Sequence, residues 1–156
     1  MRQLGLVLVP LGLALGLGAC ALVTARAGGQ ACEGAASAAF QADGTPHLVL
    51  EVARTDQERA TGLMNRQSLA PDAGIVFVFP QATSAHFWMK DTLIPLSIAF
   101  VAEDGTILDV QEMQAESLDQ HASPAPYRYA IEAAQGWFTQ HGVRPGQNVD
   151  LCFAAG

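Results

Sequence analysis

The residue types best suited to binding or catalysis gather in one short stretch, HFWMKDT at residues 86–92. Lys90 is the single lysine of the chain, whose other seven cationic residues are arginines. In an extended strand, alternate side chains point to opposite faces. One face would carry His86, Trp88 and Lys90, and the other Phe87, Met89 and Asp91. The first face is either an ordinary solvated surface, with the lysine stem lying along the indole, or a ligand-binding face.

Two further charged residues are candidates for the same face. Arg66 follows a predicted helix and lies near a glycine, so it could approach Trp88. Glu132 interrupts an apolar stretch, and an unpaired buried carboxylate is costly. We therefore expect Glu132 either to pair with Arg66 or Lys90, or to be exposed at a sheet edge. The resulting hypothesis is a depression that holds a small anionic molecule or a peptide. Its predicted residues are Arg66, Trp88, Lys90, Asp91 and Glu132.

Two other kinds of site are kept as alternatives. The first is a Cu(I) carrier, since soft ligands suit that ion; its residues would come from His86, Trp88, Met89, Met64 and Met113. The second is a hydrolase that uses Glu132 and Asp91 as a carboxylate pair. His121 and Asp119 in a polar loop could also be catalytic. No nucleophile signature, phosphate-binding glycine loop or histidine pair at metal spacing is present in the sequence. A binding domain without a cofactor is therefore favoured over an enzyme.

The charge of the chain restricts its partners. Fifteen acidic residues face eight basic ones, which gives a net charge of −7. Nucleic-acid binding depends on a basic surface, and so does adhesion to anionic lipid head groups. Neither partner is expected.

The N-terminal segment is typical of an export signal. Arg2 is followed by an apolar run over 4–17 and then by small residues. Cleavage after Ala27, at an A-x-A site, would define a signal peptide over 1–27. The sequence Leu17-Gly18-Ala19-Cys20 also resembles a lipobox, which would give a signal peptide over 1–19 and a lipid on Cys20. Both alternatives predict a periplasmic protein, and in the second alternative the lipid anchor would be its only membrane contact.

The cysteines are consistent with export. Cys20 is either removed or lipidated, which leaves Cys32 and Cys152 as a pair in a compartment where disulfides persist. A bridge between them would contribute roughly 4–5 kcal/mol in the chain-entropy description. It would tie the start of the mature chain to the last predicted strand.

The rest of the chain predicts one small domain. Residues 28–41 are rich in Gly, Ala and Ser and are interpreted as a linker, whereas 42–156 form a single β-rich domain. Thr55 and Glu58 have capping-box spacing, so a helix is expected from Asp56 to about Met64. Strands are expected at 47–52, 74–79, 85–91, 96–102, 106–113, 127–133 and 148–153, with one helical turn at 137–141. The predicted fold is mainly β, a compact β-sandwich or partly closed barrel of about seven strands with one short helix.

An ordered set of short motifs resembles the domain of unknown function 192 family. These motifs are GLMNR at 62–66, GIVFVF at 74–79, FWMKDT at 87–92, IPL at 94–96, AIE at 130–132 with Gly136, and GV at 142–143 with Gly146. The resemblance covers about 46–152 and implies a small, mainly β domain without an assigned activity. The chain has Asp91 where the family usually has Asn. Ser97 and Gln147 stand where acids are usual.

Overall fold

The computed structural model describes residues 30–32 and 35–154, and the predicted signal peptide, including Cys20, lies outside them. Within this part of the chain there are eight strands and two short helices. The strands are β1 (Gln30–Cys32), β2 (Ser37–Phe40), β3 (His47–Ala53), β4 (Ala73–Thr83), β5 (Leu96–Val101), β6 (Ile107–Met113), β7 (Tyr127–Ala134) and β8 (Val149–Ala154). The helices are α1 (Asp56–Thr61) and α2 (Trp137–Gln140).

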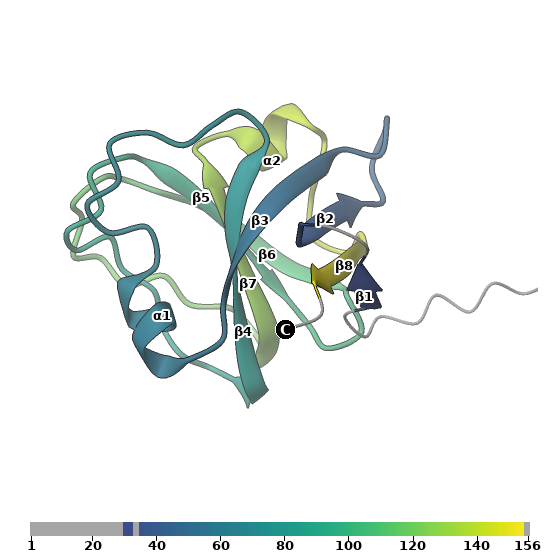
Figure 1. The fold of residues 1–156 in the computed structure, drawn as a ribbon, viewed down its shortest axis with the longest axis horizontal. Helices are drawn as coiled ribbons and strands as arrows, with labels where there is room; N and C mark the ends of the chain where they lie inside the picture. The colour runs from purple at the N-terminus through teal and green to yellow at the C-terminus, as the bar shows by residue number, and fades with distance from the viewer. Residues whose placement is uncertain (1–29, 33–34, 155–156) are drawn as a thin grey trace, which may run out of the picture.

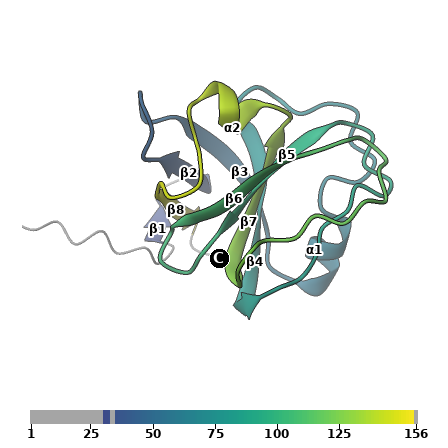
Figure 2. The same ribbon diagram turned by 180° about the vertical axis from the view of Figure 1, so that it is seen from behind.

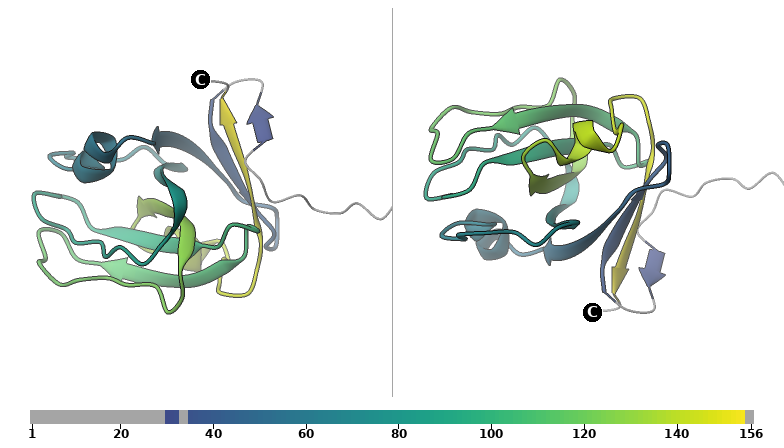
Figure 3. Two further views of the ribbon diagram at one scale, coloured as in Figure 1. Left: turned by 90° about the horizontal axis from the view of Figure 1, so that it is seen from below. Right: turned by 90° about the horizontal axis from the view of Figure 1, so that it is seen from above.

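One sheet contains all the described strands, in the order β1-β8-β2-β3-β4-β7-β5-β6. The β1–β8 and β3–β4 pairs are parallel. The sheet curls into a half-barrel, so that β6 approaches the start of β8 (Figures 1 and 3). Thr106 and Asn148 form a bridge there, and the Val149 N–H donates to the Gly105 carbonyl over 2.9 Å. The predicted mainly β fold in the form of a partly closed barrel is confirmed.

Helix α1 begins as the capping box predicts and ends earlier than expected. The Thr55 side chain accepts from the Glu58 N–H, and the Glu58 carboxylate accepts from the Thr55 N–H over 2.8 Å. The helix stops at Gly62, whose φ of 46° disfavours residues with a Cβ. A Cβ at this position would lie 3.1 Å from the Phe77 ring. The glycine thus lets the end of α1 lie close against β4.

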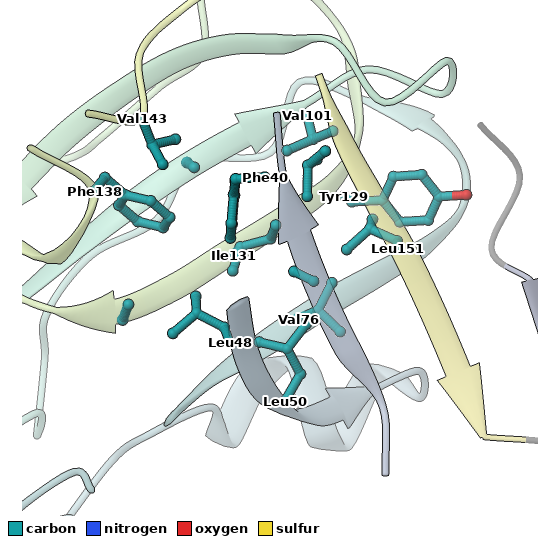
Figure 4. Packing of buried hydrophobic residues seen from close by; sticks show 14 of the residues in the cluster. Phe40, Leu48, Leu50, Val76, Val101, Tyr129, Ile131, Phe138, Val143 and Leu151 are labelled. Carbon is teal, nitrogen blue, oxygen red and sulfur yellow. The ribbon is translucent and has the colours of Figure 1, made fainter. Parts of the chain in front are cut away.

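Alternation along the central strands builds two separate cores. The closed core is the set Ala36, Ala38, Phe40, Leu48, Leu50, Val76, Ala99, Val101, Ile107, Tyr129, Ile131, Ala133, Trp137, Phe138, Val143, Val149 and Leu151. Figure 4 shows part of it. The open core is the set Ala53, Leu63, Ile75, Phe77, Phe87, Met89, Leu96, Ile98, Phe100, Met113, Tyr127 and Ala130. Strands β4, β5 and β7 supply residues to both cores, one on each side of the sheet.

The predicted strand at 85–91 is not a strand. Only Phe87 forms a bridge, with His121, and Lys90 and Asp91 lie in a turn. Strand β4 instead continues through Pro80 to Thr83, beyond the predicted end at Phe79. The register of β4 against β7 shifts between Val78 and Thr83, and such an irregularity tolerates a proline.

The linker prediction for 28–41 is wrong where the structure describes strands in that range. Strand β2 pairs with both β8 and β3, and Ala38 and Phe40 are fully buried. Small residues were read as linker composition, although in β2 they alternate as core positions. No helix in the described part of the chain is long and apolar enough to cross a membrane.

Candidate functional site

A cavity of about 260 Å³ opens on the side of the sheet that carries the open core. Its walls come from the end of α1, from the residues that follow this helix, and from the segment between β4 and β5. Strand β4 and Glu132 of β7 provide the floor. The lining residues are Arg59, Ala60, Thr61, Gly62, Leu63, Met64, Phe77, Phe79, Ala85, His86, Phe87, Trp88, Thr92 and Glu132.

Glu132 is the only acid among these lining residues, and it lies in apolar surroundings. Strand β7 is central in the sheet, so Ile75 of β4 and Ile98 of β5 flank Glu132 on either side. The residue is 5% exposed. Its carboxyl has no hydrogen-bond or ion-pair partner among residues 30–32 and 35–154. Burial raises the pKa of Glu132 to about 8, because an apolar environment disfavours the charged form. At neutral pH this carboxyl is therefore mostly protonated.

Arg59 is the only arginine or lysine among the lining residues, and its guanidinium is already occupied. It pairs with Asp56, donates to the Arg54 carbonyl, and donates to the Val78 carbonyl over 2.8 Å. The guanidinium also lies 5.1 Å from the centroid of the Phe79 ring. Arg59 thus links α1 to β4 through these contacts, in addition to contributing charge to the cavity.

Trp88 forms the rim of the cavity. Its side chain is 48% exposed, and it also lines a smaller hollow of about 170 Å³ together with Gln120. The Lys90 ammonium lies 5.6 Å from the centroid of the indole. His86 is exposed, and its Nδ1 lies 2.8 Å from Gln120 Oε1. Trp88 and Lys90 are therefore neighbours, as predicted, but Lys90 stands beside the cavity and not in its lining.

The segment that carries Trp88 is held by backbone bonds to the loop before β7. Phe87 and His121 exchange N–H···O bonds of 2.9 and 2.8 Å. The Met89 N–H donates to the Ser117 carbonyl over 3.0 Å. Phe87 and Met89 are buried, at 9% and 1% exposure. Buried and exposed side chains thus alternate along this segment as predicted for a strand, although the segment pairs with a loop.

Arg66 and Asp91 do not join the cavity. Arg66 forms an ion pair with Glu51, with 2.7 Å between Nη2 and Oε2, at an exposed position. Asp91 is exposed at a φ of 56°, and its carbonyl accepts from the Asn65 N–H over 2.7 Å. The expectation that Glu132 pairs with Arg66 or Lys90, or lies exposed at an edge, is wrong. A Glu132–Asp91 carboxylate pair is likewise not formed in the cavity.

Sequence reasoning missed Arg59 and the aromatic floor. Phe77 and Phe79 lie in the predicted strand at 74–79, and Phe79 is only partly buried. Arg59 occupies the last turn of a predicted helix, where a cation is ordinary. The signal that could have been used is the spacing of Phe77 and Phe79, which places both side chains on one face of the strand.

The soft residues considered for a metal have structural positions. Met89 and Met113 are buried in the open core, and Met64 lies partly buried on the cavity wall. His86 is on the exposed side of its segment. In the described ranges, no three or more His, Cys, Asp or Glu residues are grouped as a metal site.

Two of the three residues that depart from the family pattern make local hydrogen bonds. Ser97 is fully buried, and its hydroxyl donates to Glu112 Oε2 over 2.6 Å. The Gly136 N–H donates to both Ser97 Oγ and Glu112 Oε2, over 2.8 and 3.1 Å. Glu112 on β6 thus supplies a carboxylate beside Ser97. The Gln147 side chain accepts from the Arg144 N–H over 2.9 Å.

The fold is a small β domain built as a curled half-barrel. Its closed core is covered, and its open core borders a cavity. The family model for domain of unknown function 192, described as "Uncharacterized ACR", matches residues 38–151. The chain belongs to this family, which confirms the resemblance found in the sequence.

Two solved structures share the fold. A protein of unknown function from Novosphingobium aromaticivorans is 28% identical, covers 74% of this chain and 83% of its own length, and has a TM-score of 0.71. A protein from Sinorhizobium meliloti, provisionally described as a transcription regulator, is 29% identical, covers 79% of this chain and 98% of its own length, and has a TM-score of 0.71. No curated protein matches the chain.

Proposed function

We propose that this protein is an exported small-molecule-binding domain whose ligand occupies the cavity above Glu132. One observation carries the proposal: a buried carboxyl without a protein partner lies at the floor of an open cavity. Buried polar groups in proteins are nearly always hydrogen-bonded, because an unmade bond costs free energy. A ligand that donates to Glu132 would supply the missing bond.

The size and lining of the cavity support a small ligand. Its volume of about 260 Å³ lies just below the range of about 300–1,000 Å³ for drug-sized ligands. It exceeds the roughly 150 Å³ of an apolar cavity known to take up benzene. Phe77, Phe79, Phe87 and Trp88 give it apolar walls. A ring with one polar substituent, or one side chain of a peptide, fits these dimensions.

The floor does not favour the anionic ligand that the sequence suggested. An anion beside Glu132 would place two negative charges together in apolar surroundings. The cations that were expected to receive the anion lie elsewhere, Arg66 in an ion pair with Glu51 and Lys90 beside the rim. An anionic group is supported only near Lys90.

Export and a Cys32–Cys152 disulfide remain part of the proposal. The export pattern lies in residues 1–27, outside the described residues, and so does the side chain of Cys32. Support comes from the parallel pairing of β1 with β8, which brings the strand that carries Cys32 beside the strand that carries Cys152. Alkylation of non-reduced periplasmic protein should then find neither cysteine free. A mass shift of two free thiols would contradict the bridge.

The enzymatic alternative has weaker support. A carboxyl with a raised pKa is suited to general acid catalysis. The described cavity lining, however, contains no second carboxylate to complete a hydrolytic pair. The description of the Sinorhizobium relative also finds little support in this chain, because its net charge of −7 opposes contact with a nucleic-acid backbone.

The proposal is tested by following the two tryptophans separately. Trp88 lies at the rim, whereas the Trp137 indole N–H donates to Asp72 Oδ1 over 2.8 Å in the closed core. A library of small aromatic fragments should shift the indole N–H signal of Trp88 in nuclear magnetic resonance spectra. The Trp137 signal should stay unchanged and serves as an internal control. The proposal fails if no fragment shifts Trp88, or if both signals move equally.

A further inference from the structure

We propose that the ligand of this cavity is a small organic amine whose ammonium group lies against Glu132 and whose apolar body fills the space up to Trp88. The inference rests on the proposed function and names its ligand class. Three features carry it: the unpartnered acceptor, the aromatic walls, and the arrangement of the neighbouring charges.

The floor of the cavity lacks a hydrogen-bond donor for Glu132. The side chains that flank Glu132 across the sheet, Ile75 and Ile98, are both apolar. Leu63 and Phe77, which belong to the open core, also line the cavity. The ligand must therefore supply the donor. An ammonium group has donors and no acceptor, and an ionised carboxylate is the partner with which it forms charge-assisted hydrogen bonds.

The aromatic residues favour a cation over a neutral donor. The faces of aromatic rings carry partial negative charge and attract cations. Phe77 and Phe87 stand edge to face, with centroids 4.9 Å apart. Phe79 and Trp88 each already contact a cationic side chain, Arg59 at 5.1 Å and Lys90 at 5.6 Å. The aromatic walls of the cavity could therefore make the same cation–π contacts with an ammonium group.

The charged neighbours leave room for a cation at Glu132. Arg59 and His86 are the other titratable groups in the described lining. The charge of Arg59 is offset by Asp56 and by two carbonyls. His86 is exposed and bonded to Gln120. Arg128, four residues earlier on β7, lies roughly 13 Å away along the strand.

Amine binding changes the protonation of Glu132. Burial raises the pKa of Glu132 to about 8 in the protein without ligand. A bound ammonium favours the carboxylate, so the amine should displace the proton. Binding near pH 7 should release close to one proton for each complex, and affinity should rise as the pH approaches 8. A neutral donor of the same shape should release none.

Three probes with one ring and one short arm test the ligand class: benzylamine, benzyl alcohol and benzoate. Calorimetric titration at pH 7 in two buffers with different ionisation enthalpies measures both affinity and proton release. We expect benzylamine to bind about tenfold or more tightly than benzyl alcohol, the scale of one charge-assisted hydrogen bond, with benzoate weakest. The inference is overturned if the alcohol or benzoate binds as tightly as the amine, or if amine binding releases no proton.

Variants assign the effect to Glu132. Glu132→Gln keeps the shape and removes the charge, so benzylamine should lose its advantage over benzyl alcohol. Glu103→Gln removes the same charge from an exposed position and should leave all three affinities unchanged. An unchanged amine preference in Glu132→Gln would refute the inference. If Glu132→Gln does not fold, proton release by the unaltered protein still decides.

The outcomes also separate this inference from the proposed function. If benzyl alcohol shifts the Trp88 indole signal but the amine has no advantage, the cavity binds small molecules of another class. If benzylamine does not shift Trp88 while another fragment of the library does, only the ligand class is wrong; if no fragment shifts Trp88, the binding function fails as well.

Discussion

The two cores of this protein lie on opposite sides of the same central strands and are covered by different elements. On one side, Trp137 and Phe138 of α2 close the core together with β2 and β8, and its side chains fit together without a charged residue (Figure 4). On the other side, α1 and the segment after β4 cover the sheet incompletely. Figure 2 shows these covering elements on one side of the molecule, away from β1, β2 and β8.

The two cores differ in whether their polar groups are hydrogen-bonded. At the edge of the closed core, the Trp137 indole N–H donates to Asp72, and the Gly136 N–H donates to Ser97. In the open core, Glu132 has no such partner in the described chain. Because leaving a buried carboxyl unpaired is unfavourable, we expect the closed core to contribute more to stability than the open core. Four predictions test this division, from the largest effect to the smallest.

The largest loss should come from breaking the closed core. Phe138 is fully buried and contacts Phe40 and Trp137, with ring centroids 5.7 and 5.4 Å away. Phe138→Ala should lower the free energy of unfolding by roughly 3–5 kcal/mol, a large part of the roughly 5–15 kcal/mol typical of a domain. Urea denaturation measures this loss. A loss below about 1 kcal/mol would show that α2 does not seal the core.

The second prediction concerns the pH dependence that Glu132 confers. Burial raises its pKa from the ordinary 4.5 to about 8. Between these values the unfolded chain has lost the proton and the folded protein keeps it, so stability falls as the pH rises from about 4.5 to 8 and then levels off. The decrease should be on the order of 2–4 kcal/mol. Urea denaturation at pH 5 and pH 8 measures it.

Two variants sharpen this pH test. Glu132→Gln should be nearly independent of pH over the same interval, and at pH 8 it should be more stable than the unaltered protein. Glu103→Gln, at an exposed position, should retain the original profile. Matching profiles for Glu132→Gln and the unaltered protein would mean that Glu132 is not the titrating group.

A smaller loss is expected at the junction between α1 and the cavity. Gly62→Ala would force an alanine to a φ of 46° and bring its Cβ to 3.1 Å from Phe77. A loss of about 1–2 kcal/mol in unfolding free energy is expected. Gly142→Ala is the matched control, because Gly142 also has a positive φ, of 67°, but has open space around it. Equal losses in both variants would show that the contact with Phe77 is unimportant.

The smallest effect should follow from Lys90→Met. Lys90 is exposed, and a methionine retains the apolar stem beside Trp88. The free energy of unfolding should change by less than about 0.5 kcal/mol. Thermal and urea denaturation both measure this quantity. A loss above 1 kcal/mol would give the contact between Lys90 and Trp88 a structural role that its exposure does not suggest.

Local patterns predicted most of the fold. Period-two alternation placed Leu48, Leu50 and Val52 on one face, and these residues pack in or against the closed core. The capping box located the start of α1 correctly. Strand β2 was missed because its small residues resemble a linker until β3 and β8 pair on both sides of it. Its burial depends on partners that are distant in the sequence.

The site was predictable only in part, for the same reason. Trp88 and Glu132 were both selected from the sequence and do line one cavity. Arg59 was overlooked, and Arg66 was assigned to the cavity although it pairs with Glu51. The cation that faces the cavity depends on the direction in which α1 leaves β3 and on how far β4 extends. Neither property is encoded in the spacing around the two arginines.

The pairing of β1 with β8 also determines where the chain enters the domain relative to the cavity. Strand β1 lies at the side of the half-barrel opposite to α1, which forms one wall of the cavity (Figure 1). If the proposed export ends in a lipid anchor before Gln30, the domain would be attached from its β1 side. The attachment would then leave the approach to Trp88 uncovered.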